Sequence, residues 1–382
     1  MKFMEYQARE TFNNYGIPVM NGVVIDSVSQ IPDSLYELKF PLVVKAQVQV
    51  GGRGKAGGIQ FAENMSDVKR ISEQLLYKDL KGHKINRLMI VEKASGIKEC
   101  YLSIILDRLS KFPMIIFSAE GGIDIEDTAV TNPNAIIKAP IDPEIGVQKY
   151  MIQYIVNKSG IDKEIIPALY ELIKNLYVMF MDTDAMLAEI NPLLICEDYS
   201  LIALDGKVDV DDSALYRQPK VLEYRDAIQE EKLILEARKF DFLYIPVEEE
   251  GDIGVISNGS GMLMSSIDLI SKAGMSVGAA LDLGGGATSD RIEEAVRIVT
   301  SNEDIRFLYI NIFGGITRCN EVAYGVKESM KDQGKGKCVI VRLEGTNKEE
   351  GIEILKSANT DIISVDGLTE GVSALSERRP VR

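Results

Sequence analysis

The spacing of hydrophobic and polar positions divides the chain into two parts. In the first part, strands and helices follow one another in no fixed order. The runs FPLVVKAQVQV and GIQFAE predict two strands around a glycine loop, and residues 143–181 predict mostly helix. The run MLAEINPLLICEDYSLIALDGKVDV predicts two strands joined by a short polar turn.

In the second part, a strand, a turn and a helix recur five times. DIGVISNGSG precedes MLMSSIDLISKAG, for example, and IRFLYINIFGGITR precedes CNEVAYGVKESM. Apolar strands that alternate with helices predict an open, doubly wound parallel sheet. We therefore predict a chain of mixed class, α+β and then α/β, with domains of residues 1–240 and 241–382.

The glycine loop lies in AQVQVGGRGKAGGIQFAE, residues 46–63. Its glycines have the spacing of a dinucleotide-binding fingerprint, but a strand follows them where that motif needs a helix. Lys55 is followed by Ala56, which excludes a Walker P-loop. Two interpretations stay open: a loop that brings Arg53 and Lys55 to an anion such as a phosphate, and a plain hairpin with solvated charges.

The hairpin at residues 185–207 places polar side chains on one face. If the turn CEDYS is centred on Asp198, Asn191 faces Asp205 and Glu189 faces Lys207. An amide oxygen opposite a carboxylate suits Mg²⁺ carried with phosphates. A solvated polar face of an antiparallel sheet explains the same pattern, and a slip of one residue in register would remove the pairing.

Three turns of the second part are rich in glycine, and each is followed by a helix. Ligands of open parallel sheets bind at this edge, where helix N-termini offer free N–H groups. Three such turns favour a carboxylate or phosphate ligand over tight packing alone. The turns are Asn258-Gly259-Ser260-Gly261, Gly284-Gly285-Gly286-Ala287-Thr288 and Gly314-Gly315-Ile316-Thr317.

Composition narrows the class of protein. A net charge of -15 over 382 residues argues against binding of nucleic acid or of an anionic membrane as the main function. The four cysteines are widely spaced without a C-x-x-C pair, which fits a reducing compartment and predicts no zinc site. No apolar run is long enough to span a membrane, and the first residues resemble neither a signal nor a transit peptide. We expect a cytoplasmic protein.

Histidine chemistry is nearly absent from the sequence. His83, in KDLKGHKINR, is the one histidine, and a charged loop makes it a surface residue. No Ser/His/Asp or Cys/His nucleophile can be assembled around it.

At this point the chain resembles the β subunits of the succinyl-CoA synthetase (succinate–CoA ligase) family. The resemblance runs from EYQARETFNNYGIP to DGLTEG and is carried by GGRGKAGG, SAEGGIDIE, AEINPL, LDGK, LDLGGGAT, NIFGGITRC and VRLEGTN. It implies an N-terminal ATP-grasp region and a flavodoxin-like C-terminal domain. It also implies the reaction: ATP or GTP, succinate and CoA interconvert with the nucleoside diphosphate, phosphate and succinyl-CoA.

The resemblance also implies roles for residues. An α subunit is expected to carry the phosphohistidine, with Glu189 beside it as the catalytic acidic residue when it visits the nucleotide. Asn191 and Asp205 match the Mg²⁺ ligands. Two further sets are implied: for the nucleotide, Lys45, Gly52, Arg53, Gly54, Glu92, Ser95 and Glu99; for the dicarboxylate, Asn258, Gly315, Ile316 and Thr317.

Three rival functions stay open on the residues alone. The first is a β subunit for malate or acetate on the same scaffold. The second is a non-catalytic regulatory subunit, which the intact Lys45, Asn191 and Asp205 oppose. The third is a self-sufficient carboxylate–amine ligase, which would leave the glycine turns of residues 241–382 unexplained.

Overall fold

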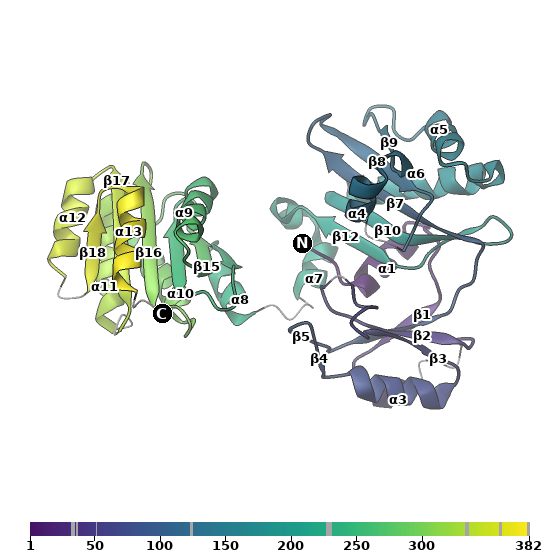
Figure 1. The fold of residues 1–382 in the computed structure, drawn as a ribbon, viewed down its shortest axis with the longest axis horizontal. Helices are drawn as coiled ribbons and strands as arrows, with labels where there is room; N and C mark the ends of the chain where they lie inside the picture. The colour runs from purple at the N-terminus through teal and green to yellow at the C-terminus, as the bar shows by residue number, and fades with distance from the viewer. Residues whose placement is uncertain are drawn as a thin grey trace. The chain divides into compact units, whose positions relative to one another are not determined.

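The computed structural model describes residues 1–31, 35, 37–50, 52–122, 125–226, 231–332, 336–358 and 361–379. The chain divides into two compact units, Met1–Ile228 and Gln229–Arg382 (Figure 1). Helix α8 (Lys232–Arg238) joins the second unit, because Ala237 is buried in that unit's core and Glu236 pairs with Arg297. The second unit therefore begins before residue 240, where the sequence pattern placed the boundary.

The first unit contains a small antiparallel sheet covered by one helix. Its strands run in the order β1 (Gly22–Ile25), β6 (Leu88–Glu92), β2 (Leu42–Ala46) and β3 (Ile59–Ala62). Helix α3 (Met65–Leu75) lies across one face, and its apolar side chains pack there against those of β2 and β6 (Figure 1). Asn64 caps this helix, since its side chain accepts from the Asp67 amide.

The first unit also contains a larger antiparallel sheet. Its order is β11-β10-β7-β8-β9, and β12 also pairs with β10. Helices α5 (Lys149–Ser159) and α6 (Ile166–Asp182) pack on it, as the sequence predicted for residues 143–181. The strands are β7 (Lys98–Asp107), β8 (Phe112–Ser118), β9 (Ile137–Pro140), β10 (Ala185–Ile195), β11 (Leu201–Ala203) and β12 (Gly206–Val210).

Helix α1 (Glu5–Asn14) contributes to the core of this second sheet. Ala8 and Phe12 lie one turn apart and are buried. Gly16, with φ of 71°, then turns the chain out of the helix. Short elements complete the first unit: β4 (Asp79–Leu80), β5 (His83–Lys84), α4 (Ile125–Thr131) and α7 (Pro219–Asp226).

The second unit is a six-stranded sheet with helices on both faces, which confirms the doubly wound prediction. Its order is β13-β15-β14-β16-β17-β18, and every pair is parallel except the edge strand β13. In chain order the five parallel strands therefore run 2-1-3-4-5, the flavodoxin-like arrangement. The strands are β13 (Leu243–Pro246), β14 (Ile253–Ser257), β15 (Val277–Asp282), β16 (Phe307–Gly314), β17 (Cys338–Gly345) and β18 (Ile362–Val365).

Two separate cores explain the two helical layers. On one face, α9 (Ser260–Lys272) and α13 (Leu368–Arg378) bury residues such as Tyr309. On the other, the core formed with α8 contains Ile292, Val322 and Leu355, one from each of α10 (Ser289–Thr300), α11 (Cys319–Asp332) and α12 (Lys348–Lys356). Among the described residues, no helix has the length and apolar character needed to cross a bilayer.

Phe12 allows a test of the core between α1 and the second sheet. Its side chain is 1% exposed, so Phe12→Ala is expected to lower the free energy of unfolding by about 3–5 kcal/mol. Phe61→Ala is the matched control, because Phe61 is 60% exposed and should change stability by less than about 1 kcal/mol. Denaturant unfolding of both variants measures the difference, and equal losses would contradict this account of the core.

Candidate functional site

Strand β2 places Lys45 on the face of the small sheet opposite α3. Side chains alternate along a strand, so Val43 and Lys45 share this face whereas Val44 packs beneath the helix. The buried Lys45 ammonium lies 2.7 Å from Glu5 Oε1 and donates to the Leu204 carbonyl oxygen at 2.8 Å. A buried ammonium requires such partners.

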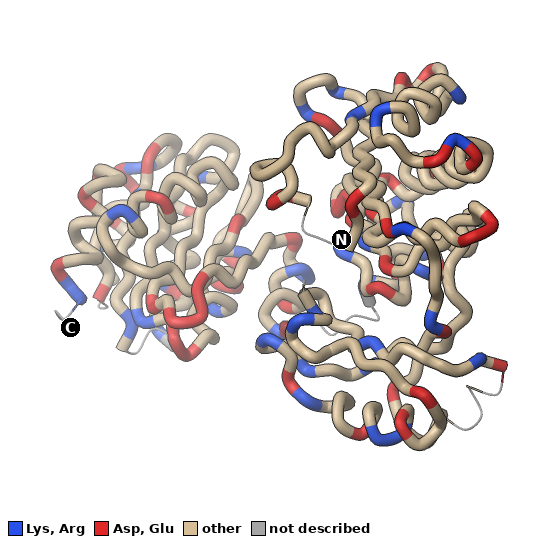
Figure 2. Tube along the Cα trace, turned by 45° about the vertical axis from the view of Figure 1, so that its right-hand side comes forward, with Lys and Arg blue, Asp and Glu red and all other residues tan. Residues whose placement is uncertain are grey.

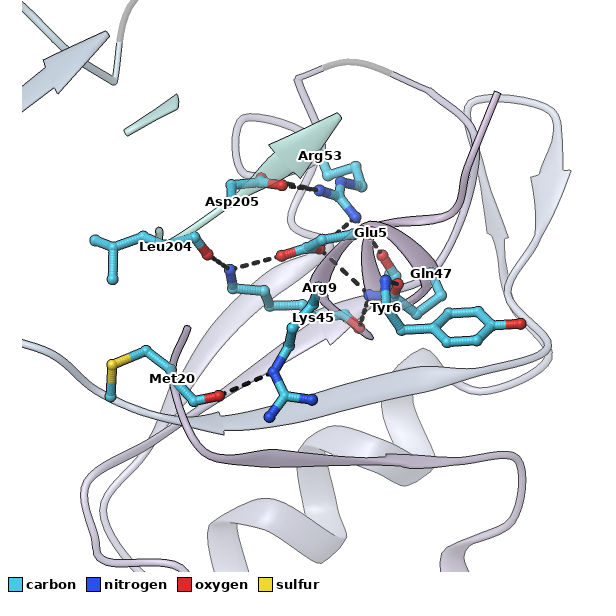
Figure 3. A network of polar contacts seen from close by, with 10 residues as sticks. Glu5, Tyr6, Arg9, Met20, Lys45, Gln47, Arg53, Leu204 and Asp205 are labelled. Carbon is cyan, nitrogen blue, oxygen red and sulfur yellow. Dashed lines mark hydrogen bonds and ion pairs between the residues drawn. The ribbon is translucent and has the colours of Figure 1, made fainter. Parts of the chain in front are cut away.

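The glycine loop places Arg53 between two carboxylates (Figure 3). Arg53 Nη1 lies 2.6 Å from Glu5 Oε2 and donates to the Ala46 carbonyl oxygen at 3.2 Å. Arg53 Nη2 donates to Asp205 Oδ2 at 2.9 Å and to Oδ1 at 3.3 Å. The loop is thus tied by one side chain to α1 and to the segment before β12.

Other residues of the glycine loop are more exposed than Arg53. Gly52, Gly54 and Lys55 are exposed, and Gly51 lies outside the described residues. The Gly58 amide donates to the Arg53 carbonyl oxygen at 2.8 Å and closes the loop, and β3 follows. The loop therefore returns as a strand, as the sequence predicted, with exposed backbone on either side of Arg53.

The hairpin has the register that the sequence predicted. Glu189 pairs with Lys207 across β10 and β12, and the Asn191 amide donates to the Asp205 carbonyl oxygen at 3.1 Å. Asn191 Oδ1 accepts from the Gly122 amide at 2.8 Å. The Asn191 and Asp205 positions are therefore adjacent, but their side chains already have partners from two different loops.

The turn at Gly121 and Gly122 connects the hairpin to Glu99. The Gly121 amide donates to the Glu99 carbonyl oxygen at 3.1 Å, and a Cβ on Gly121 would lie 2.5 Å from the Cys100 carbonyl oxygen. Only glycine allows this close approach. A Cβ on Gly122 would lie 2.9 Å from Glu99 Oε2, so Glu99 and Asn191 both lie beside this one turn.

Glu189 is held by a neighbouring strand. Tyr101 is a buried residue of β7, and its hydroxyl donates to Glu189 Oε2 at 2.9 Å. Burial and the Glu189 carboxylate raise the pKa of Tyr101 well above its ordinary value. Tyr101 therefore stays protonated, and its hydroxyl orients Glu189 by donating a hydrogen bond to the carboxylate.

The two carboxylates that contact Arg53, Glu5 and Asp205, have pKa values shifted in opposite directions (Figure 3). Burial acts to raise the pKa of Glu5, but Lys45 and Arg53 outweigh it and lower that pKa below its ordinary value. Burial and the nearby Glu5 carboxylate raise the pKa of Asp205 to about 6. Elsewhere, Lys and Arg positions are interspersed with Asp and Glu positions in each unit (Figure 2). Glu5 is therefore the carboxylate that the two cations stabilise more strongly in its charged form.

Glu92 and Ser95 lie at the end of β6 and in the connection from β6 to β7. Glu92 ends β6 and accepts from the Lys39 amide at 2.9 Å and from Asn21 Nδ2 at 3.4 Å. Ser95 is exposed in the segment that leads into β7. In the described part of the chain, no hydrogen bond or ion pair that we find joins these two residues to Lys45 or Arg53.

A shallow recess lies next to Glu5 and Asp205. Its walls include the apolar side chains of Met20, Met89 and Leu204. Charged groups therefore lie beside an apolar surface between α1, β6 and the hairpin.

In the second unit, two of the glycine turns meet where the strand order reverses. Asn258 follows β14 and the turn of Gly314 and Gly315 ends β16, and these neighbouring strands form the switch point of the sheet. Asn258 Nδ2 donates to the Phe313 carbonyl oxygen at 2.9 Å, and the Phe313 amide donates to Asn258 Oδ1 at 3.0 Å. The two turns are thereby fastened to each other.

Thr317 joins the third turn to this edge. Its hydroxyl accepts from the amides of Gly286 at 3.1 Å and Ala287 at 3.3 Å, and the residue is 2% exposed. Ile316 is 87% exposed, and a Cβ on Gly315 would meet nothing within 4 Å. Thr317 therefore holds the turns together, while Gly315 and Ile316 offer accessible surface.

Sequence reasoning missed Glu5 and the roles of Tyr101 and the Gly121–Gly122 turn. Glu5 begins α1, where an acidic residue already has an explanation in the helix dipole. A signal existed, because EYQARETFNNYGIP and SAEGGIDIE were among the segments that carried the resemblance. Only the fold brings both segments beside β10 and β12.

Comparison with protein families gives two matches. The ATP-grasp domain family matches residues 2–195, and the CoA-ligase family matches residues 256–374. The first match contains Lys45, Arg53 and Asn191, and the second contains the three glycine turns.

Similar proteins cover the whole chain. The succinate–CoA ligase [ADP-forming] subunit beta of Desulfatibacillum aliphaticivorans is 41% identical, with 99% of each chain covered. The protein of the same name from Bacillus pumilus is 38% identical over 98% of this chain and 99% of its own. Among solved structures, ATP citrate lyase from Methanothrix soehngenii, in complex with citrate and coenzyme A, has a TM-score of 0.76 at 17% identity, with 99% of each chain covered. That structural likeness supports the fold alone.

Proposed function

This chain belongs to the family of ADP-forming succinate–CoA ligase β subunits, and we propose that it provides the nucleotide site of such a ligase. The reaction interconverts ATP, succinate and CoA with ADP, phosphate and succinyl-CoA. The observation that carries the proposal is the convergence of Lys45, Arg53 and Asp205 within one connected set of ion pairs. An overall acidic chain thereby holds two cations, each paired with a carboxylate, where a phosphate would bind.

The nucleotide is assigned to the first unit. Lys45 and the exposed backbone of Gly52, Arg53 and Gly54 would hold the phosphates, and Glu92, Ser95 and Glu99 the nucleoside.

Asn191 and Asp205 fit a magnesium ion that arrives with the nucleotide. Both are hard oxygen donors at adjacent positions of one hairpin. Among the described residues, no cluster of three or more His, Cys, Asp or Glu side chains could hold a metal without further ligands. Phosphate oxygens would therefore complete the coordination, and bound Mg²⁺ would offset the charge of the phosphates.

The second unit is proposed to bind succinate and to share the CoA reaction with a partner. Gly315 and Ile316 are accessible at the switch point, Asn258 shapes the neighbouring turn and Thr317 fixes the third. Backbone N–H groups at this edge suit a carboxylate.

Phosphoryl transfer is proposed to use a histidine of an α subunit. In the direction of nucleotide synthesis, the imidazole takes the phosphoryl group from the acyl phosphate, releases succinate and then transfers the group to ADP. Glu189, oriented by Tyr101, would accept from the imidazole N–H at the nucleotide site. His83 is exposed on β5, pairs with Leu80 and contacts none of these groups.

The rival functions have less support. The names of the similar proteins favour succinate over malate or acetate. The connected charges at Lys45, Arg53 and Asp205 disfavour a regulatory subunit that has lost its site. The CoA-ligase match disfavours a self-sufficient carboxylate–amine ligase. We keep the cytoplasm as the proposed compartment, because all four cysteines are free.

Asp205→Asn tests the metal site. The change keeps the size of the side chain but removes its charge, so the dissociation constant of the magnesium nucleotide should rise about tenfold or more. Asp198→Asn, at the tip of the same hairpin, is the control and should bind as the wild type does. Calorimetric titration measures both, and unaltered binding in Asp205→Asn would remove this residue from the site.

Gly54→Val tests the loop. A Cβ on Gly54 would lie 3.8 Å from Ile59 Cδ1, an ordinary contact, so the fold should accept the change. The added side chain should block approach to the phosphates and raise the nucleotide KM about tenfold. Thermal unfolding serves as the control, and an unchanged KM would show that the loop is a structural hairpin.

Dependence on a second subunit tests the histidine assignment. The purified chain should form no succinyl-CoA alone, and activity should appear when an α subunit is added. With γ-labelled ATP, phosphate should appear on α, and His83→Ala should keep most of the activity of the complex. Labelling of His83, or turnover by this chain alone, would overturn the assignment.

A further inference from the structure

Glu5 is the most completely satisfied carboxylate beside the proposed nucleotide site (Figure 3). Its side chain is 3% exposed and lies 2.7 Å from Lys45 Nζ and 2.6 Å from Arg53 Nη1. Gln47 Nε2 adds a third contact to Glu5 Oε2 at 3.3 Å. The short segment of residues 45–53 thus places three donors on one carboxylate of α1.

The two cations that Glu5 holds belong to residues assigned to the phosphates, Lys45 through its side chain and Arg53 through its backbone. Lys45 has a side-chain exposure of 10% and Arg53 of 11%. Two long side chains of like charge would separate in the absence of a shared anion, and each loses rotamer freedom when it is fixed. Glu5 offsets their repulsion before any nucleotide is present.

Arg53 also occupies the carboxylate assigned to the metal. Arg53 Nη2 contacts both oxygens of Asp205, and Nη1 contacts Glu5 and the Ala46 carbonyl oxygen. Both terminal nitrogens are therefore in use. A cation that binds Asp205 would share this carboxylate with Arg53 Nη2, and the two positive charges would compete for it.

We propose that Glu5 is a positioning residue of the nucleotide site, which holds Lys45 and Arg53 ready for phosphate and keeps Arg53 when Asp205 binds the metal. This inference rests on the proposed function, because it takes the metal and nucleotide assignments as given. Glu5 itself touches neither ligand and acts through Arg53 and Lys45. An outer partner of this kind sets the orientation and availability of the groups that bind the ligand.

A second buried carboxylate shows what a purely structural arrangement looks like. Asp252 is 5% exposed and binds Arg306 Nη2 and Arg379 Nη2, each at 2.7 Å. It lies just before β14, at the amino end of the parallel strands and therefore at the sheet edge opposite the glycine turns. Neither arginine has a second carboxylate among the ion pairs of the described residues. Asp252 thus resembles Glu5 in being buried and in binding two cations. It differs because, in the described part of the chain, neither of its arginines contacts a second carboxylate, as Arg53 contacts Asp205.

Loss of the charge on Glu5 has a specific consequence. In Glu5→Gln, Asp205 is the remaining carboxylate for Arg53, so Arg53 competes more strongly with the metal. The Mg²⁺ concentration for half-maximal nucleotide binding should rise about tenfold. A role limited to stability would lower the unfolding temperature and leave this concentration unchanged.

The experiment measures ADP binding by calorimetry in the complex with the α subunit, at fixed ADP and increasing Mg²⁺. Asp252→Asn is the matched control: it should lower the unfolding temperature as Glu5→Gln does, with an unchanged Mg²⁺ requirement. Arg53→Met removes the competitor, so Glu5→Gln added to Arg53→Met should shift the requirement less than twofold. Glu5→Asp keeps the charge on a shorter side chain and should give an intermediate value, which provides a second measurement if Glu5→Gln does not fold.

The outcomes separate this inference from the proposed function. Absence of Mg²⁺-dependent ADP binding in the wild-type complex would refute the function itself. Normal wild-type binding with an unshifted Mg²⁺ requirement in Glu5→Gln and Glu5→Asp would leave Glu5 a structural residue. An equal shift in the wild-type and Arg53→Met backgrounds would show that Glu5 does not act through Arg53, and the inference would also fail.

Discussion

The first unit depends on one constraint: charges that are removed from water must be neutralised by partners inside the protein. Lys45 lies on a central strand whose other residues are apolar, and it can be buried there because Glu5 and the Leu204 carbonyl oxygen receive its ammonium. The same carboxylate binds Arg53, and Arg53 binds Asp205. A helix, a strand, a loop and a hairpin are thus held by a single alternating series of charges.

The architecture explains why this series forms between two small sheets. Each sheet buries one face beneath its helices, and α1 belongs to the core of one while its first residue reaches the other. Loops and strand ends meet there, and these are the positions that tolerate charged side chains. The residues that neutralise buried charge are therefore also those that we propose for the ligand site, and the effect of a substitution such as Glu5→Gln has to be compared with that of a structural control.

The second unit solves a different problem with the backbone. Its strand order reverses between β14 and β16, so the turns after these strands are adjacent in space although they are distant in the sequence. Asn258 and Thr317 fasten the turns through backbone amides and carbonyls, and Gly315 remains accessible. One unit thus offers side-chain charge and the other offers backbone N–H groups, which suits a reaction with both phosphate and carboxylate substrates.

The sequence by itself determined the elements, the doubly wound sheet and the register of the hairpin, because these follow from local periodicity and from glycine and polar turns. The pairing of Glu189 with Lys207 could be counted from the turn at Asp198. Tertiary structure alone decided that Arg53 binds Glu5 and Asp205, and that α8 joins the second unit. These contacts join residues far apart in the chain, and the energetic demand that creates them, the burial of charge, arises only after the sheets and helices have packed.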